Sequence, residues 1–173
     1  VFSPGADRWT AVKPLESGTG PGMRGFLPLV YVDSLGATFL FGGQWGFNNA
    51  GDKGNQAWLY DAYTNEWRLL PPTDPQPGAR AHHGMCYIRH LNKVLMTGGS
   101  YRGADNRTWL YDPADHKWTD TQATARMPDG KGGFEKVKSP QFRLPVCYDP
   151  VSRTVLKFAV GEHGTHVWEF DPQ

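Results

Sequence analysis

The stretch Trp58-Leu59-Tyr60-Asp61, with Trp67 following it, decides the fold because the chain contains it twice. It recurs 51 residues later as Trp109-Leu110-Tyr111-Asp112, again with a second tryptophan, Trp118, nine residues after the first. Agreement in both residue type and spacing indicates an internal repeat. A period of about fifty residues is typical of domains built from stacked supersecondary units.

Two further copies of this stretch have diverged. Residues 168–171 read Trp-Glu-Phe-Asp, and Phe2 with Trp9 reproduces the second half of the unit. Three periods separate Phe2 from Phe170. The repeat therefore extends over nearly the whole chain.

A second shared block precedes each tryptophan stretch. Arg24 stands as far before Gly42-Gly43 as Arg80 stands before Gly98-Gly99. Short apolar runs between turn residues predict strands. The aligned first strands are residues 29–32, 85–88 and 146–149, and the second strands are residues 38–41, 94–97 and 155–158. Third and fourth strands then carry the two tryptophan positions.

This pattern resembles the Kelch motif, in which a diglycine closes the second strand and a tyrosine and a tryptophan follow at fixed offsets. The resemblance implies an all-β fold of Kelch-type β-propeller blades, each a four-stranded antiparallel sheet. The tryptophans are expected to fill the wedge between neighbouring blades. The third copy has Ala159-Val160 in place of the diglycine, so the exit of its second strand should bend differently.

The repeat phase makes residues 1–173 a single Kelch-type propeller segment of about three blades. It predicts an orphan outer strand at 1–12, blades at 13–67 and 68–118, and a blade lacking its outer strand at 119–173. Known propellers have about four to eight blades, so this is a partial propeller. Two interpretations stay open: an arc of a larger ring of about six or seven blades, and a head-to-tail self-dimer of three-blade halves.

The charges favour neither nucleic acid nor an anionic membrane as a partner. The chain has 18 Lys and Arg against 17 Asp and Glu, a formal net charge of +1. The densest basic stretch, residues 126–138, is interrupted by Asp129 and Glu135 and is expected to be a solvated loop. No apolar run approaches a membrane span. Residues 1–10 lack an apolar signal core, so a mature, a cytosolic or a truncated chain all fit and the localisation stays unknown.

The two cysteines occupy the same repeat position in successive blades. Cys86 and Cys147 are therefore expected to be buried free thiols, separated by a blade spacing and too far apart for a disulfide. Such thiols carry no information about the redox compartment.

The histidines do not form a convincing metal site. His82 and His83 follow Arg80 at the start of a first strand, where a structural role is expected. His163 and His166 lie three apart in a predicted loop and could chelate, but they lack carboxylate or thiolate company. We predict no metal and no cofactor.

An enzyme on this scaffold is the alternative hypothesis. Copper-radical oxidases similar to galactose oxidase also use a Kelch propeller, and they need a cysteine near a ligating tyrosine together with histidine ligands. Here the cysteines fall in strands and no Tyr-His dipeptide occurs. No Ser/His/Asp set or carboxylate pair is brought together by the repeat, so no catalytic residue is predicted. The propeller part of a carbohydrate-active oxidase, epimerase or hydrolase remains open by fold analogy.

Recognition of a protein or glycan by a non-catalytic scaffold module is the favoured function. Kelch domains that bind proteins commonly use the loops between second and third strands and the loops between blades. Here those loops, residues 44–49 and 100–105, carry aromatic and charged groups, and Arg, Trp and Tyr are frequent interface anchors. Trp45 and Phe47 could equally cap the core. The predicted ligand-binding residues are Arg24, Trp45, Asn48, Arg80, His82, Tyr101 and Arg102.

Overall fold

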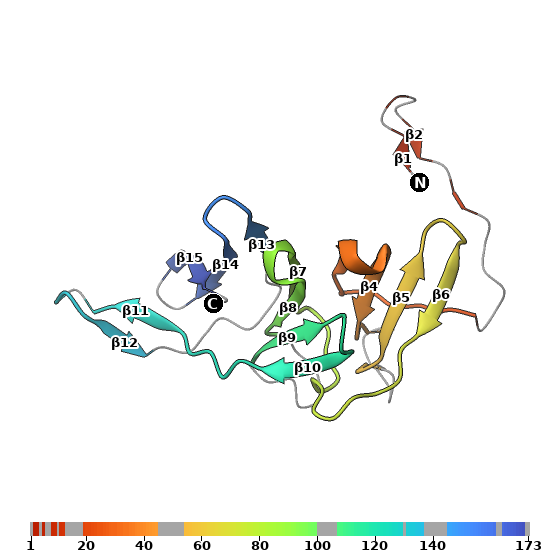
Figure 1. Cartoon of the computed structure of the whole chain (residues 1–173). Helices are drawn as coiled ribbons and strands as arrows, with labels where there is room; N and C mark the ends of the chain where they lie inside the picture. The colour runs from red at the N-terminus through yellow and green to blue at the C-terminus, as the bar shows by residue number, and fades with distance from the viewer. Residues whose placement is uncertain are drawn as a thin grey trace.

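The computed structural model describes residues 2–3, 5, 8–9, 11–12, 19–44, 54–99, 107–129, 131–136, 145–161 and 164–171. Within these ranges the regular elements are β-strands and two short 3-10 turns, with no α-helix. Three antiparallel sheets lie side by side along an arc (Figure 1), which confirms the predicted all-β fold of propeller blades.

The first two sheets each contain four strands in simple up-and-down order. The first comprises β3 (Leu29–Val32), β4 (Ala37–Phe41), β5 (Ala57–Asp61) and β6 (Glu66–Leu69). The second comprises β7 (Gly84–Ile88), β8 (Lys93–Thr97), β9 (Thr108–Asp112) and β10 (Lys117–Asp120). The third has three strands, β13 (Val146–Asp149), β14 (Thr154–Gly161) and β15 (Gly164–Phe170).

The first strands of the three sheets are neighbours, since β7 lies in contact with both β3 and β13. The first strands thus lie on the inner side of the arc and the fourth strands on its outer side. This is the arrangement of blades around a propeller axis. The sheets follow the repeat, but the division of the chain at residues 67 and 118 stays a prediction.

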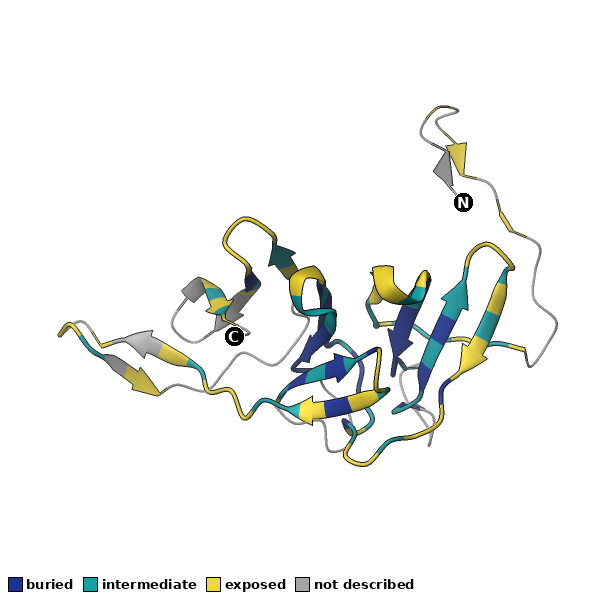
Figure 2. Cartoon of the chain, in the orientation of Figure 1, coloured by how far each residue is buried: buried dark blue, intermediate teal, exposed yellow. Residues whose placement is uncertain are grey.

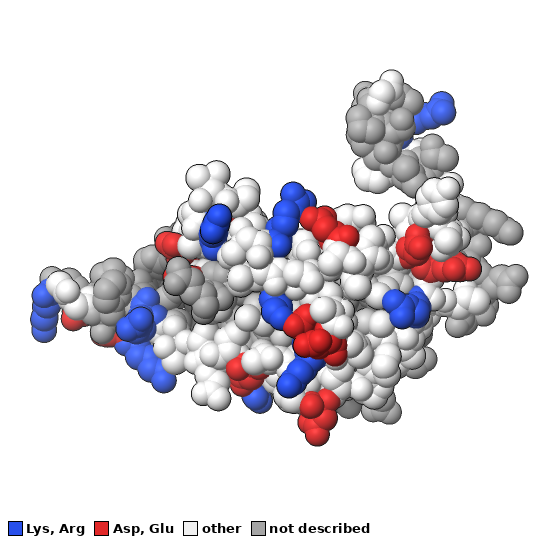
Figure 3. Space-filling model, viewed as in Figure 1, with Lys and Arg blue, Asp and Glu red and all other residues white. Residues whose placement is uncertain are grey.

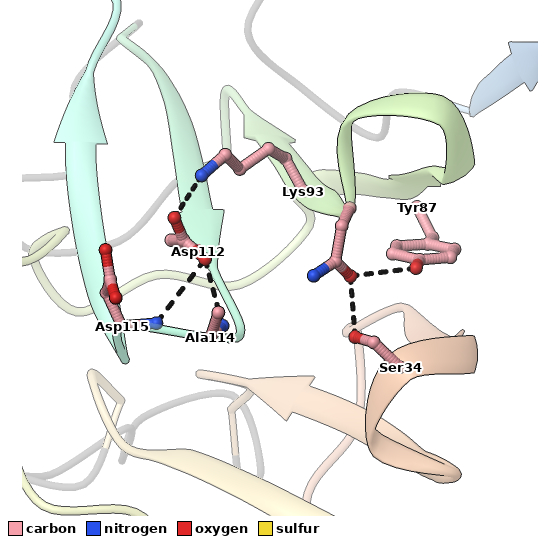
Figure 4. A network of polar contacts seen from close by, with 7 residues as sticks. Ser34, Tyr87, Lys93, Asp112, Ala114 and Asp115 are labelled. Carbon is pink, nitrogen blue, oxygen red and sulfur yellow. Dashed lines mark hydrogen bonds and ion pairs between the residues drawn. The ribbon is translucent and has the colours of Figure 1, made fainter.

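Tight turns join the first and second strands at one end of the blades. The 3-10 turns η1 (Asp33–Leu35) and η3 (Arg89–Leu91) end in left-handed residues, Gly36 at φ 58° and Asn92 at φ 53°. Asn92 also ties the first two sheets together: its Oδ1 accepts hydrogen bonds from Tyr87 of its own sheet at 2.9 Å and from Ser34 of the neighbouring sheet at 2.6 Å (Figure 4).

Carboxylates organise the turns between third and fourth strands at the same end. Asp112 accepts the backbone N–H of Ala114 at 2.9 Å and forms an ion pair with Lys93 of β8 (Figure 4). Asp61, its counterpart in the first sheet, accepts the N–H of Tyr63 at 2.8 Å. Asp residues suit such turns because the side chain reaches the backbone two residues on.

Aromatic residues fill the first interface between sheets. Phe39 of β4 stacks on Tyr111 of β9 with ring centroids 4.6 Å apart. Trp118 of β10 is 1% exposed and lies edge-on to Phe41 at 5.1 Å. Figure 2 shows this buried seam between the two sheets. The prediction that tryptophans fill the wedge between blades is confirmed for Trp109 and Trp118, both buried.

A smaller cluster forms the second interface. Leu95 of β8 and Val155 of β14 are buried there, with Phe170 of β15 packed against them. Burial of this kind stabilises a fold by about 25 cal/mol per Å² of apolar surface. The larger aromatic cluster therefore stabilises the interface between the first and second sheets more than the smaller cluster stabilises the interface between the second and third.

The third sheet departs from the others where the diglycine is missing, as predicted. In the first two sheets the second strand stops before glycines with φ between 67° and 102°. In the third, β14 continues through Ala159-Val160 and pairs with β15 as far as Gly161 opposite Gly164. Ala159 and Val160 have no ready access to the left-handed region, so the strand continues where the second strands of the other sheets stop.

Two short hairpins lie outside the three sheets. β1 (Phe2–Ser3) pairs with β2 (Arg8–Trp9); the role of residues 1–12 as the outer strand of a blade stays a prediction. β11 (Arg126–Pro128) pairs with β12 (Phe134–Lys136), where the sequence predicted only a solvated loop.

Asp129 accounts for that second hairpin. Its Oδ1 accepts backbone N–H groups of Lys131 at 2.8 Å and Gly133 at 2.9 Å, and Gly132 between them has φ 88°. A carboxylate that accepts local N–H groups together with a left-handed glycine makes a tight turn. The charge pattern alone did not reveal this.

Candidate binding face at the diglycine end

Two arginines at equivalent repeat positions each donate hydrogen bonds to the end of the second strand in their own sheet. In the first sheet the Nη1 atom of Arg24 donates to the carbonyl of Gly42 at 3.0 Å and Nη2 donates to Oε1 of Gln56 at 2.6 Å. In the second sheet Nη1 of Arg80 donates to the carbonyl of Gly98 at 3.1 Å. The glycine backbone turns away from the sheet here, so the guanidinium supplies the donor that a neighbouring strand would otherwise provide.

The diglycine of the first sheet is also packed against the entrance of the second. The N–H of Gly43 donates to the carbonyl of Arg80 at 2.9 Å, and the N–H of Arg80 donates to that of Gly54 at 3.0 Å. A Cβ at Gly42 would lie 2.5 Å from the carbonyl oxygen of Arg80. Only glycine fits such a close backbone approach, which explains the diglycine of the motif.

Two rings, the exposed Phe26 and the half-buried His82, form a rim at the diglycine end of the first two sheets. Phe26 and His82 lie two residues after the equivalent arginines, and both have left-handed backbones, with φ 58° and 59°. Their ring centroids are 4.4 Å apart, and the N–H of His82 donates to the carbonyl of Phe26 at 2.6 Å. Phe26 is 50% exposed. A left-handed conformation at two bulky residues is strained, and such strain is found most often at binding and active sites.

His83 lies directly beneath this rim and is almost fully buried. Burial lowers its pKa from 6.5 to about 3, with the positive charges of Arg80 and His82 adding to the effect and the backbone of Phe41 opposing it weakly. Within the part of the chain that the structure describes, neither ring nitrogen makes a hydrogen bond of good geometry, although the backbone of Phe41 lies near enough to raise the pKa slightly. His83 is therefore a neutral ring at physiological pH.

The structure brings together three of the predicted binding residues and gives them different environments. Arg24 is half-buried and Arg80 fully buried, each with its guanidinium on backbone carbonyls, while His82 lies on the rim. The four others lie outside the described residues: Trp45, Asn48, Tyr101 and Arg102. A ligand-binding role for all seven stays a prediction.

Sequence reasoning missed Phe26. The signal was available, because Phe26 follows Arg24 by the same two residues that separate His82 from Arg80. Recognising its exposure needed the backbone, since only the positive φ turns the ring outward from the start of the strand.

The charges show no concentrated patch in the view of Figure 3, where basic and acidic groups are interspersed. No cluster of three or more His, Cys, Asp or Glu side chains with the geometry of a metal site occurs among the residues described. His163 lies outside them, as does the side chain of His166. None of the described helical segments is long and apolar enough to cross a membrane.

The cysteines are both free, but only one is buried. Burial raises the pKa of Cys86 to about 12, with a smaller effect from Cys147. Cys147 is exposed, so the prediction of two buried thiols was wrong for this residue. Its counterpart Cys86 is covered by the following sheet, whereas in the described chain no sheet covers that side of β13.

Three features of this structure are typical of a Kelch propeller. They are the repeated blades, the hydrogen bonds between an arginine and the diglycine, and the tryptophans buried between neighbouring sheets. A family model described as the KLHDC2/KLHL20/DRC7 Kelch-repeats domain matches residues 1–139. The match covers most of the chain, including both four-stranded sheets. Domains of this type are in general protein-interaction scaffolds. The chain belongs to the Kelch-repeat family.

Proposed function

We propose that this chain is a non-catalytic recognition module that binds a protein partner through the rim at its diglycine end. The rim comprises Phe26 and His82, with the loops of residues 45–53 and 100–106 predicted beside them. The general role of Kelch-repeat domains in protein interaction supports this proposal.

The stacked pair of Phe26 and His82 carries the proposal. The two rings come from the segments that lead into β3 and β7, and the backbone hydrogen bond between the same residues fixes their positions. Rings held in place before binding lose little conformational entropy when a partner arrives. An aromatic surface with one polar ring offers both apolar contact and a hydrogen-bonding group, which suits the centre of a protein interface.

Glycine substitutions provide the sharpest test of this face. Because both backbones have φ near 60°, Phe26→Gly and His82→Gly remove the rings and relieve backbone strain. Peptides selected from a displayed random library against the immobilised chain would be labelled, and their affinity measured by fluorescence polarisation. We expect the double variant to bind at least tenfold more weakly.

Tyr63→Ala is the matched control. Tyr63 is 98% exposed in a turn between third and fourth strands, so its removal should leave peptide affinity unchanged. A triple Ala variant at Trp45, Tyr101 and Arg102 tests the predicted loops in the same assay. Equal affinity of the ring-deleted and wild-type chains would refute the rim as the site, and selective binding in a glycan array with no peptide binding would replace a protein ligand by a glycan.

A further inference from the structure

The link between the second and third sheets contains an insertion that the equivalent link between the first and second sheets lacks. Residues 70–83 join β6 to β7, and residues 121–145 join β10 to β13, which makes the second link 11 residues longer. The hairpin of β11 and β12 spans residues 126–136, the same extra length. Figure 1 shows this hairpin projecting clear of the three sheets. Neither neighbouring blade needs it to complete its sheet.

Pro128 determines which backbone groups of the hairpin face outward. It pairs with Phe134, and because proline has no N–H, this pair cannot exchange the two bonds of a hydrogen-bonded pair. The bond on the turn side of the pair, from the N–H of Asp129 to the carbonyl of Gly133 at 3.0 Å, agrees with this. The two kinds of pair alternate along an antiparallel ladder. The N–H and C=O groups of Phe134 and Lys136 therefore point away from β11.

The two outer edges of the hairpin differ in their capacity to accept another strand. Among the residues described, β11 and β12 pair with each other and with no other strand. The edge of β11 is interrupted by Pro128, which has no N–H to donate. On β12, Phe134 and Lys136 each direct one donor and one acceptor outward. Regularly spaced donors and acceptors at a strand edge form a template for an added strand.

The hairpin lacks the contacts that usually stabilise a sheet. Two short strands are marginally stable without a further strand or a layer packed on them. Arg126 lies directly opposite Lys136, and like charges at cross-strand positions are destabilising. A third strand would add backbone hydrogen bonds along β12. A carboxylate on that strand would also offset the repulsion between the two cations.

The charged side chains of the two strands are divided between the faces of the hairpin. Cross-strand partners share a face and successive residues alternate, so Arg126 and Lys136 lie on one face and Glu135 lies on the other. All three are exposed. An added strand therefore meets a cation beside Lys136 and an anion beside Glu135. The segment that fits has acidic residues at every second position, with uncharged or basic residues between them.

We propose that the outer edge of β12 binds an extended acidic segment of a partner protein, which adds to the hairpin as a third strand. Its backbone pairs with the outward groups of Phe134 and Lys136, and one of its carboxylates lies beside the ammonium group of Lys136. In strand addition the main chain supplies affinity and alternate side chains supply selectivity. The proposal goes beyond the rim of Phe26 and His82 and does not depend on binding there.

Fluorescence polarisation with two labelled peptides tests the proposal. One peptide alternates Thr with Glu and the other alternates Thr with Lys, since threonine favours extended structure. We expect the wild type to bind the Thr-Glu peptide at least tenfold more tightly than the Thr-Lys peptide. Lys136→Glu should weaken Thr-Glu binding at least tenfold. Lys117→Glu is the matched control, because it makes the same charge change at an exposed position of β10 and should bind as the wild type does.

Deletion of residues 126–136 tests the hairpin as a whole. The deletion gives the second link the length of the first, so we expect the blades to fold and Thr-Glu binding to be lost. The double variant Phe26→Gly and His82→Gly should bind the Thr-Glu peptide as the wild type does. Binding at the rim and binding at the hairpin are thus measured separately, and failure of one proposal leaves the other standing.

Amide hydrogen exchange measured by NMR distinguishes an added strand from attraction between charges alone. When the wild type is saturated with the Thr-Glu peptide, the N–H groups of Phe134 and Lys136 should exchange at least tenfold more slowly. The N–H of Glu135 points to β11 in the register of the hairpin, so its exchange should change less.

Three results would overturn the proposal. The first is a wild type that binds the two peptides equally or not at all. The second is a deletion variant that retains Thr-Glu binding. The third is a bound peptide that leaves exchange at Phe134 and Lys136 unchanged, which would mean that no strand is added. The first and third measurements use the unmodified chain, so they do not depend on the folding of any variant.

Discussion

Arg80 donates Nη1 to the carbonyl of Gly98 at 3.1 Å, and Arg24 makes the same bond to Gly42 at 3.0 Å, in both cases across 18 residues of sequence. The repeated bond explains why the motif carries an arginine so far before its diglycine. The arginine side chain extends over the end of its own sheet. Its guanidinium group stabilises the backbone where the chain leaves the second strand. The rim residues that follow each arginine are positioned by this bond.

The buried arginine should therefore matter more to stability than to binding. Arg80→Met keeps the apolar stem but leaves the carbonyls of Gly98 and Gly78 without their donor. An unsatisfied buried group costs about 1 to 3 kcal/mol, so we expect the free energy of unfolding in urea to fall by about 3 kcal/mol. The half-buried Arg24→Met should cost less. Equal stability of Arg80→Met and wild type would show that water replaces the guanidinium.

The diglycine should tolerate no side chain. Gly42→Ala forces a left-handed φ of 70° on alanine and places its Cβ 2.5 Å from the carbonyl oxygen of Arg80. We expect a loss of about 3 kcal/mol or more in chemical denaturation, because backbone on both sides must move.

Gly36 supplies the matched control for this substitution. It has φ 58°, a Cβ added to it would meet nothing within 4 Å, and its repeat counterpart is Asn92, also left-handed. Gly36→Asn should therefore change the unfolding free energy by less than about 1 kcal/mol. If Gly42→Ala were as mild as Gly36→Asn, close packing at the diglycine would not be the reason for its presence.

Repeat phase alone was sufficient to predict the blade strands. The apolar first and second strands and the tryptophan positions all follow from aligning the copies, because a blade buried on both faces needs apolar residues at fixed positions. For the third sheet the sequence predicted only that the exit of the second strand bends differently. The strand is instead longer than predicted, because losing the diglycine removes the residues that permit the bend.

The sequence did not predict side-chain directions or local turns. Arg24 and Arg80 were expected on a binding surface, yet their guanidinium groups turn inward to backbone carbonyls. Whether an arginine faces solvent or a carbonyl depends on the backbone that it follows, which composition does not reveal. The hairpin closed by Asp129 and the exposure of Phe26 were missed for the same reason, because each depends on a positive φ nearby.

His83 should make the fold sensitive to mild acid. Its folded-state pKa is about 3 and its ordinary value is 6.5, so the unfolded chain takes up a proton as the pH falls below 6.5 while the folded chain does not until near pH 3. Stability therefore falls with decreasing pH in this window, by about 1.4 kcal/mol per pH unit once the unfolded ring is protonated.

His83→Leu removes this proton linkage and two unsatisfied ring nitrogens, and it restores the residue that the first repeat has at Leu27. At pH 7 we expect about 1 to 2 kcal/mol of added stability. Urea denaturation between pH 7 and pH 4 should show this advantage growing as the pH falls. Val94→Ala, which removes buried apolar atoms and no titratable group, should instead differ from wild type by a constant amount. An advantage of His83→Leu that stays constant with pH would mean that His83 takes up a proton in the folded chain as readily as in the unfolded one.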